Sequence, residues 1–122
     1  MQGNDLEELY LVDADGERRL TDFNREALAD IDVSVPVHVT VENGTEEPLD
    51  AWVMKPGGFV EGRKYPAILN IHGGPKMAFG DVYVHEMQCW AAKGYVVLYA
   101  NPRGSDGRGN AFDDIRGKYG AV

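Results

Sequence analysis

Apolar and polar residues alternate most clearly over residues 35–41, where a valine occupies every second position. This period of two predicts a half-buried strand with its valines on the covered face. Pro36 places that strand at the edge of a sheet, because proline has no N–H to donate to a neighbour. A second apolar run, residues 49–55, follows a turn-rich segment and stops at a Pro-Gly-Gly sequence. The two runs are predicted to pair as antiparallel strands.

Two later segments, residues 67–71 and 95–100, are almost continuously apolar, which is typical of strands covered on both faces. Between them, residues 82–93 repeat apolar side chains at helical spacing. Asp81 is predicted to cap the start of this helix and Gly94 to end it. Strand, helix and parallel strand in this order form a right-handed crossover, so the fold class is α/β.

The first part of the chain predicts a β-hairpin, since residues 8–12 and 17–21 flank an Asp-Gly turn. Asn24 is predicted to cap a short helix that ends at Ala29, with Phe23 packed on it as a hydrophobic staple. A lone hairpin is only marginally stable in water, so this one is expected to belong to a larger structure.

Composition narrows the possible functions. The chain has 122 residues, of which 43% are hydrophobic and 26% charged, as in a soluble domain with one core. A net charge of −8 repels phosphate backbones, which excludes a nucleic-acid partner. No apolar run approaches the roughly 20 residues of a membrane span, and the first residues lack the features of a signal peptide. A cytoplasmic location is the default expectation.

Candidate chemistry is concentrated at His72-Gly73-Gly74-Pro75, directly after the first continuous apolar strand. Glycines here let backbone N–H groups face an open site, because no Cβ blocks a ligand, and this predicts anion or oxyanion binding. The alternative is a tight connection with no ligand. His72 is predicted to hold the turn rather than to act as a base.

A glycine-rich loop, residues 101–109, follows the second continuous strand. It lacks the lysine and the Ser/Thr of a phosphate-binding P-loop, so nucleotide binding is not expected. Arg103 is predicted to fix the loop through backbone carbonyls rather than to bind a substrate carboxylate. Asn110 is predicted to cap a last helix that carries Phe112, Ile115 and Tyr119 on one face.

The remaining histidines are far apart in the sequence. His38 and His85 are predicted to be exposed or edge residues, and no histidine pair has the spacing of metal ligands, so no metal site is expected. Cys89 is the only cysteine, which excludes an internal disulfide. Cys89 is predicted to be a buried or half-buried helix residue.

A resemblance to a known family lies in the sequences of residues 64–75, 91–95 and 101–105. The chain resembles the serine peptidases of the prolyl oligopeptidase family, particularly its acylaminoacyl-peptidase and dipeptidyl-peptidase-like members. Residues 20–24 resemble the exit from that family's β-propeller. Residues 51–56 resemble the second strand of its hydrolase domain. The resemblance implies a partial α/β-hydrolase fold, peptide substrates and no cofactor.

The same resemblance implies roles for the parts of this chain. Residues 1–33 correspond to a propeller-exit hairpin and linker helix, and residues 34–122 to the N-terminal portion of the hydrolase domain, ahead of the nucleophile elbow. The second donor of the family's oxyanion hole falls on Gly74. The other turn residues support that donor: His72, Gly73 and Pro75. Arg103 and Gly104 correspond to a structural loop.

The chain departs from the family pattern in its serines. It contains only Ser34 and Ser105, and neither lies in a Gly-x-Ser-x-Gly elbow. The catalytic serine, aspartate and histidine are expected downstream of Val122, and the isolated chain is predicted to be inactive. Two alternatives remain open: a non-catalytic module that self-associates through an open sheet edge, and a piece of an α/β-hydrolase esterase.

Overall fold

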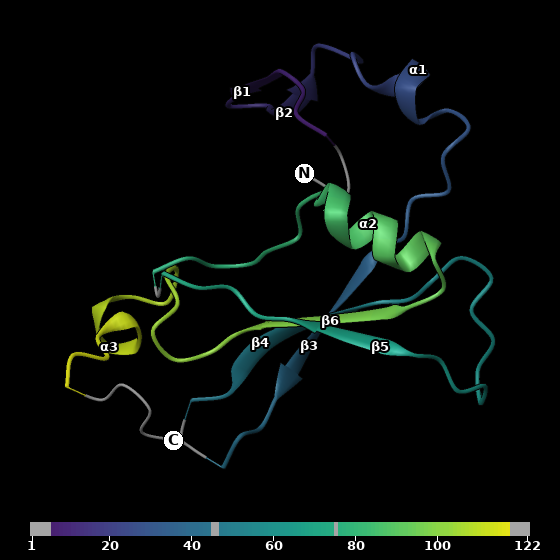
Figure 1. The fold of residues 1–122 in the computed structure, drawn as a ribbon. Helices are drawn as coiled ribbons and strands as arrows, with labels where there is room; N and C mark the ends of the chain where they lie inside the picture. The colour runs from purple at the N-terminus through teal and green to yellow at the C-terminus, as the bar shows by residue number, and fades with distance from the viewer. Residues whose placement is uncertain (1–5, 45–46, 75, 118–122) are drawn as a thin grey trace.

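The computed structural model describes residues 6–44, 47–74 and 76–117, and its elements form a small hairpin and one larger sheet (Figure 1). In chain order the elements are β1 (Tyr10–Asp13), β2 (Gly16–Arg19), α1 (Arg25–Leu28), β3 (Pro36–Val41), β4 (Leu49–Met54), β5 (Ala67–Asn70), α2 (His85–Ala92), β6 (Val96–Asn101) and α3 (Asn110–Asp113).

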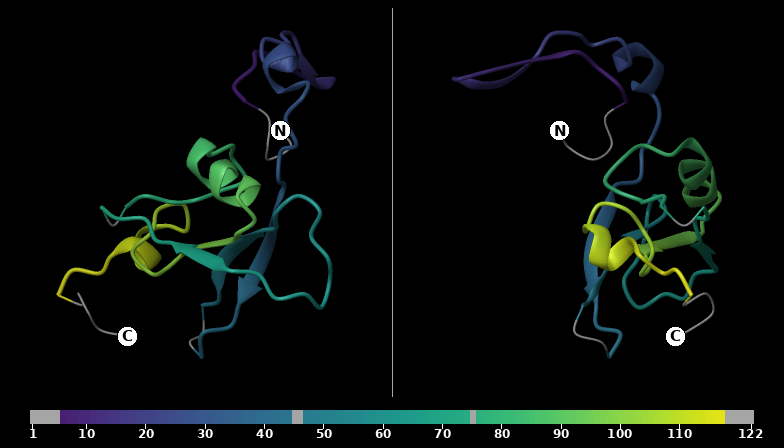
Figure 2. Two further views of the ribbon diagram at one scale, coloured as in Figure 1. Left: turned by 45° about the vertical axis from the view of Figure 1, so that its right-hand side comes forward. Right: turned by 90° about the vertical axis from the view of Figure 1, so that its left-hand side faces the viewer.

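The predicted N-terminal hairpin is confirmed. β1 and β2 pair antiparallel, with Asp13 opposite Gly16. Gly16 has φ +123°, a conformation that L side chains rarely adopt, which explains why glycine closes this turn. The hairpin and α1 stand beyond α2, apart from the larger sheet (Figures 1 and 2).

The larger sheet has four strands in the order β3-β4-β6-β5. β3 and β4 pair antiparallel, β4 and β6 pair antiparallel, and β5 and β6 pair parallel. The antiparallel pair, the parallel crossover through α2 and the edge position of β3 were all predicted from the sequence and are confirmed. The prediction that β5 is covered on both faces is wrong, because β5 is the other edge strand and Leu69 is 63% exposed.

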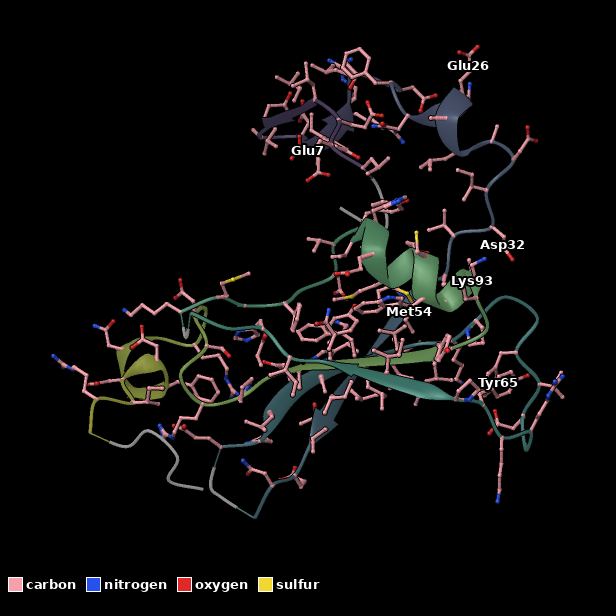
Figure 3. The ribbon with its side chains drawn as sticks, viewed as in Figure 1. Glu7, Glu26, Asp32, Met54, Tyr65 and Lys93 are labelled. Carbon is pink, nitrogen blue, oxygen red and sulfur yellow. The ribbon has the colours of Figure 1, made fainter. Side chains whose placement is uncertain are left out.

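The core lies between α2 and one face of the sheet, and Met54 points toward α2 (Figure 3). The Trp52 ring stacks on the Tyr99 ring at a centroid distance of 5.4 Å. Burial, with a smaller effect from the Asp81 charge, raises the pKa of Tyr99 to about 12, so this phenol stays neutral over the physiological range. The buried members of the core cluster are Trp52, Met54, Met87, Ala91, Val97 and Tyr99.

The valines of β3 lie on the opposite face of the sheet from this core. Val37 pairs with Val53 and is 54% exposed, whereas Pro36 is buried. The prediction that the valine face is the covered one is therefore wrong. The reason is that α2 packs against the face that carries Trp52 and Met54. The alternation gave the period of the strand correctly but not which of its faces is covered.

Helix ends differ in part from the predictions. The N-cap of α2 is Val84, so the predicted cap by Asp81 is wrong; Asp81 instead accepts a 2.7 Å hydrogen bond from the Trp52 indole N–H. The predicted end at Gly94 is confirmed. Gly94 has φ +91° and its N–H donates to Ala91, while the Tyr95 N–H donates back to Trp90, as in a Schellman motif.

The two short helices also depart from expectation. Asn24 precedes α1 but makes no side-chain cap, and Phe23 is 71% exposed, so the predicted staple is absent. α3 begins after Gly109, so Asn110 is its first residue and not its cap. Tyr119, predicted on the same helix, lies outside the described residues. Cys89 is exposed on α2, which corrects its predicted burial. In the described ranges no helix is long and apolar enough to span a membrane.

Candidate active-site turn

The turn that follows β5 presents a free backbone donor. Gly74 is exposed and has φ +79°. Among the described residues, none accepts a hydrogen bond from its N–H. A Cβ built on Gly73 or on Gly74 would meet no atom within 4 Å, so the backbone here faces open space. Such a turn can offer an N–H to an anionic ligand atom. Pro75 lies outside the described residues.

His72 connects this turn to the loop that follows β6. Its Nε2 lies 2.9 Å from the Ser105 hydroxyl, across 33 residues of sequence. The imidazole also packs edge-to-face on Phe79, with a centroid distance of 5.1 Å. The Nδ1 atom is buried and has no partner within the described chain. These contacts join His72 to the loop after β6 and to Phe79.

The His72–Ser105 pair does not have the arrangement of a nucleophilic dyad. Ser105 is only 1% exposed, so a substrate carbonyl has no path to its hydroxyl. A catalytic histidine also needs an acidic partner on its second nitrogen, and no described residue bonds Nδ1 here. The other serine, Ser34, precedes β3, and its backbone N–H and C=O are both held by the Gln88 side chain.

Asn101 forms the second connection between the two loops. It is the last residue of β6 and is 7% exposed. Its side-chain amide accepts a 2.7 Å hydrogen bond from the Phe79 N–H and donates a 2.9 Å bond to the Phe79 carbonyl. One side chain therefore satisfies both backbone groups of Phe79, as a paired strand would. Lys76 adds an ion pair to Asp113 at 3.0 Å.

The two residues assigned to loop structure make contacts of that kind. Gly104 has φ +103°, and a Cβ on it would lie 2.9 Å from Ile115. Its N–H donates to Phe112 at 2.9 Å. Arg103 donates to the Ala111 carbonyl and to the Glu47 carboxylate, each at 2.9 Å. These contacts join the loop after β6 to α3 and to the segment before β4.

Comparison with known proteins matches this arrangement to one family. The sequence profile of the prolyl oligopeptidase family matches residues 81–122. The uncharacterized peptidase YuxL of Bacillus subtilis (strain 168) is 41% identical over 115 residues, which is 93% of this chain. The acylaminoacyl peptidase of Pyrococcus horikoshii superposes with a TM-score of 0.77 and 40% identity over 87% of this chain. The chain thus matches the prolyl oligopeptidase family in sequence and fold.

Two further proteins are similar to the chain. Dipeptidyl-peptidase 5 of Arthroderma otae is 38% identical over 83 residues, or 66% of this chain. An acylaminoacyl peptidase in complex with Z-Gly-Gly-Phe-chloromethyl ketone superposes with a TM-score of 0.78 and 42% identity. The predicted partial α/β-hydrolase fold is thereby confirmed. The chain spans 18% of YuxL, 11% of dipeptidyl-peptidase 5 and 17% of the Pyrococcus structure.

The remaining histidines lie away from the turn. His38 on β3 is exposed and pairs with Asp50 at 2.9 Å. His85 on α2 is exposed and contacts the Cys89 thiol at 3.5 Å. No group of three or more histidine, cysteine or acidic side chains in the described part of the chain is arranged to hold a metal ion.

Sequence reasoning missed Asn101 and Ser105 as partners of the turn. The sequence pattern presents Ser105 only as a possible nucleophile and Asn101 only as the start of a loop. A usable signal was present, because the carboxyl ends of neighbouring parallel strands meet at the same edge of a sheet. The two loops that follow β5 and β6 therefore had to lie side by side.

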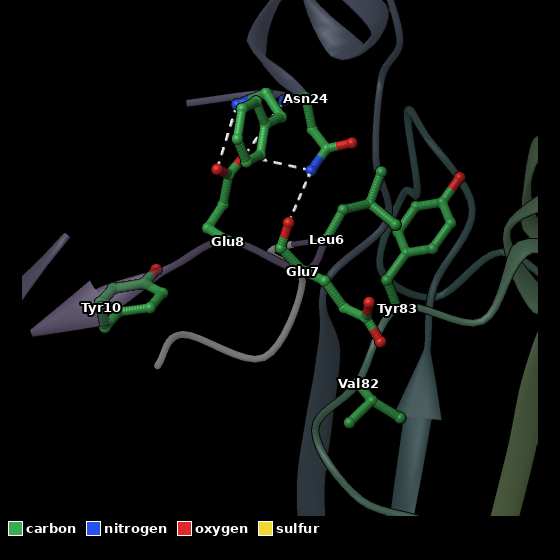
Figure 4. Close-up of a pocket in the computed structure, with 8 residues that line it drawn as sticks. Leu6, Glu7, Glu8, Tyr10, Asn24, Val82 and Tyr83 are labelled. Atoms are coloured by element: carbon green, nitrogen blue, oxygen red, sulfur yellow. Dashed lines mark hydrogen bonds between the residues drawn. The ribbon is translucent and has the colours of Figure 1, made fainter. Parts of the chain in front are cut away.

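A separate pocket of about 740 Å³ lies between the N-terminal hairpin and the segment before α2 (Figure 4). Glu8 organises its hairpin side. Its enclosed carboxylate accepts hydrogen bonds from the Thr21 hydroxyl and from the N–H groups of Phe23 and Asn24, and it pairs with Arg19. Burial alone raises the pKa of a carboxyl, but here these bonds lower the pKa of Glu8 to about 2.

Glu8 is predicted to make the hairpin sensitive to acid. Its pKa falls from an ordinary value of 4.5 to about 2 on folding, so its stabilisation is complete above pH 4.5 and is lost as the pH falls toward 2. Nuclear magnetic resonance titration of the Glu8 carboxyl and the Phe23 amide should show one transition near pH 2. A Glu8→Gln variant should abolish that transition, whereas Glu26→Gln, on the exposed helix α1, should leave it in place. A Glu8 midpoint near 4.5 would contradict the assignment.

Proposed function

We propose that this chain supplies the oxyanion-binding turn of a serine peptidase that hydrolyses acyl-aminoacyl or short-peptide bonds. In this proposal residues 1–33 are the exit from a propeller, and residues 34–122 are the first part of the hydrolase domain. The nucleophilic serine, the base and the orienting aspartate follow Val122. The single observation that carries the proposal is that Gly74, in the turn after β5, is exposed with φ +79° and that no described residue accepts a hydrogen bond from its N–H.

The chemistry assigned to Gly74 follows from acyl transfer. When a serine attacks a peptide carbonyl, the carbonyl oxygen becomes a negatively charged tetrahedral oxygen. One N–H, from the residue after the nucleophile, and a second, from the loop after the third hydrolase strand, stabilise it. A donor of this kind contributes about 3 kcal/mol to transition-state stabilisation. Gly74 occupies the position of the second donor.

The substrate class is argued from the relatives. Two solved structures that superpose on the chain are those of acylaminoacyl peptidases, and dipeptidyl-peptidase 5 of Arthroderma otae is 38% identical over 66% of the chain. Both names are those of peptidases. We extend that class to the protein that contains this chain.

The proposal is tested with the protein that contains the chain and the residues that follow Val122. It should turn over acyl-aminoacyl or dipeptidyl chromogenic substrates. A Gly74→Ala substitution should lower kcat about 10-fold to 100-fold, since alanine disfavours φ +79° and displaces the donor. Gly44→Ala is the matched control, because Gly44 has φ +80°, is equally open and lies in the turn between β3 and β4. Both variants should show a similar decrease in the free energy of unfolding in urea, while only Gly74→Ala should show a lower kcat.

Two outcomes of that experiment would count against the proposal. Turnover of a simple aryl ester with no peptide substrate cleaved would move the protein to the esterase branch. Equal rates for the Gly74→Ala and Gly44→Ala variants would remove Gly74 from the oxyanion hole.

The chain of 122 residues alone is predicted to be inactive. Ser105 is buried, and neither Ser105 nor Ser34 lies in a Gly-x-Ser-x-Gly elbow, so a fluorophosphonate probe should label neither. Mass spectrometry of the treated chain checks this directly, with the longer protein as the positive control. A covalent adduct on Ser105 would contradict the prediction.

A second candidate function is a non-catalytic, self-associating module. One observation favours it: the sheet face opposite α2 exposes apolar side chains on both edge strands, including Val37 and Val41 on β3 and Leu69 on β5. Sedimentation of the isolated chain should then show dimers or larger species that Leu69→Lys shifts toward monomer. Lys93→Ala on α2 serves as a control. A sharp monomer peak for the unmodified chain would contradict self-association.

A further inference from the structure

We propose that Asn101, the last residue of β6, and Ser105, in the loop that follows, are positioning residues that fix the Gly74 donor from outside its own turn. We name the two contacts His72–Ser105 and Asn101–Phe79 the loop clamp. This inference rests on the proposed function and assigns it two residues that are not part of the glycine turn. Neither residue touches the reacting atoms.

The position of the two contacts along the chain supports this role. Gly74 lies two residues after His72 and five before Phe79, so the clamp holds the segment on both sides of the donor. The N–H of Gly74 makes no bond to another described residue, so that peptide has no anchor of its own. A donor that must stay free for a ligand can be fixed only through its neighbours. The clamp supplies that constraint.

Burial makes these bonds effective. Ser105 and Asn101 are both almost fully enclosed, so water does not compete for their polar groups. Removing one partner would leave a buried donor or acceptor unsatisfied, which is costly in a low-dielectric surrounding. His72 and Phe79, which lie on either side of Gly74, are therefore held by buried bonds.

The orphaned Nδ1 of His72 assigns its proton. An unsatisfied buried N–H is rarer in proteins than an unsatisfied acceptor. Since Nδ1 has no acceptor within the described chain, the proton belongs on Nε2, which then donates to the Ser105 hydroxyl oxygen. In this tautomer the Nε2 atom is a donor to Ser105 and the unprotonated Nδ1 atom is buried, so His72 has a structural role.

Aromatic side chains connect the clamp to the hydrophobic core. The His72 ring packs edge-to-face on Phe79, and Phe79 packs edge-to-face on Tyr99 at 5.1 Å. Tyr99 stacks in turn on Trp52 beneath the core helix α2. The turn is thus connected through aromatic rings to the core cluster. If the clamp were broken, the turn could shift relative to that core.

The test uses the protein that contains this chain together with the residues after Val122. Ser105→Ala removes one heteroatom from the clamp, and Cys89→Ala removes one from the exposed face of α2 as the matched control. Ser105→Ala should lower kcat about 10-fold to 100-fold with KM changed less than about two-fold, because a displaced oxyanion donor affects the transition state and not the bound substrate. Cys89→Ala should keep both constants.

Two further readouts separate positioning from general destabilisation. A peptide boronate, which binds as a tetrahedral adduct, should lose affinity for Ser105→Ala in proportion to kcat/KM, while a product peptide should not. The Ser105→Ala, His72→Ala double variant should be no slower than His72→Ala alone, because both changes break one contact. If Ser105→Ala does not fold in urea-unfolding assays, Ser105→Cys retains the volume and a weak bond, and its kcat should fall several-fold.

The outcomes distinguish this inference from the proposed function. Unmodified protein that cleaves no peptide substrate overturns the proposed function, and with it any catalytic role of the clamp. Active unmodified protein whose folded Ser105 variants keep full kcat overturns the clamp alone. Strictly additive effects of the Ser105 and His72 substitutions would also overturn it, because the two residues would then act separately.

Discussion

The side-chain amide of Asn101 bonded to both backbone groups of Phe79 is the contact on which the site depends. It joins the loop after β5 to the loop after β6 at the point where the parallel pair of strands ends. Parallel neighbours bring their following loops to one edge of the sheet, but they do not by themselves fix the conformation of either loop. Here a buried side chain acts in place of a further ladder hydrogen bond. The open turn at Gly74 is therefore a supported structure and not a loose connection.

The turn and the core form one mechanical unit. Aromatic rings continue from His72 through Phe79 and Tyr99 to Trp52, and the Trp52 indole reaches out again to Asp81. The segment between β5 and α2 is thus fixed to the sheet at several points along its length. The opposite face of the sheet has no such cover within the described chain, as the exposure of Val37 and Leu69 shows. The structure combines one well-packed face, which carries the turn, with one apolar face that is open to a partner.

Much of the fold was predictable from local pattern. The valine alternation, the Asp-Gly turn and the continuous apolar runs gave the strands and their pairing, because each depends on residues close together in sequence. The covered face of β3 was not predictable, since a period of two is the same whichever face receives the helix. The Asp81 cap failed for a related reason. A tryptophan 29 residues away competes for that carboxylate, and its approach depends on the tertiary fold.

The candidate site divides in the same way. Gly74 was found because glycine has a local conformational meaning, and its φ of +79° requires that residue type. The supports of Gly74 were found only in three dimensions. The His72–Ser105 contact spans 33 residues, and a serine in a glycine-rich loop has no sequence signature that would reveal its partner. Residue chemistry therefore located the donor, and packing revealed what holds it.

Amide hydrogen exchange at single-residue resolution tests the central claim that a free donor is held by bonds on both sides. The Phe79 amide, bonded to Asn101 and shielded, should exchange slowly, like the amides of β6, while the Gly74 amide should exchange rapidly. An Asn101→Ala variant should speed exchange at Phe79 and leave the hairpin amides of β1 and β2 unchanged. A Gly74 amide as protected as that of Phe79, or a Phe79 amide as fast as that of Gly74, would contradict the account.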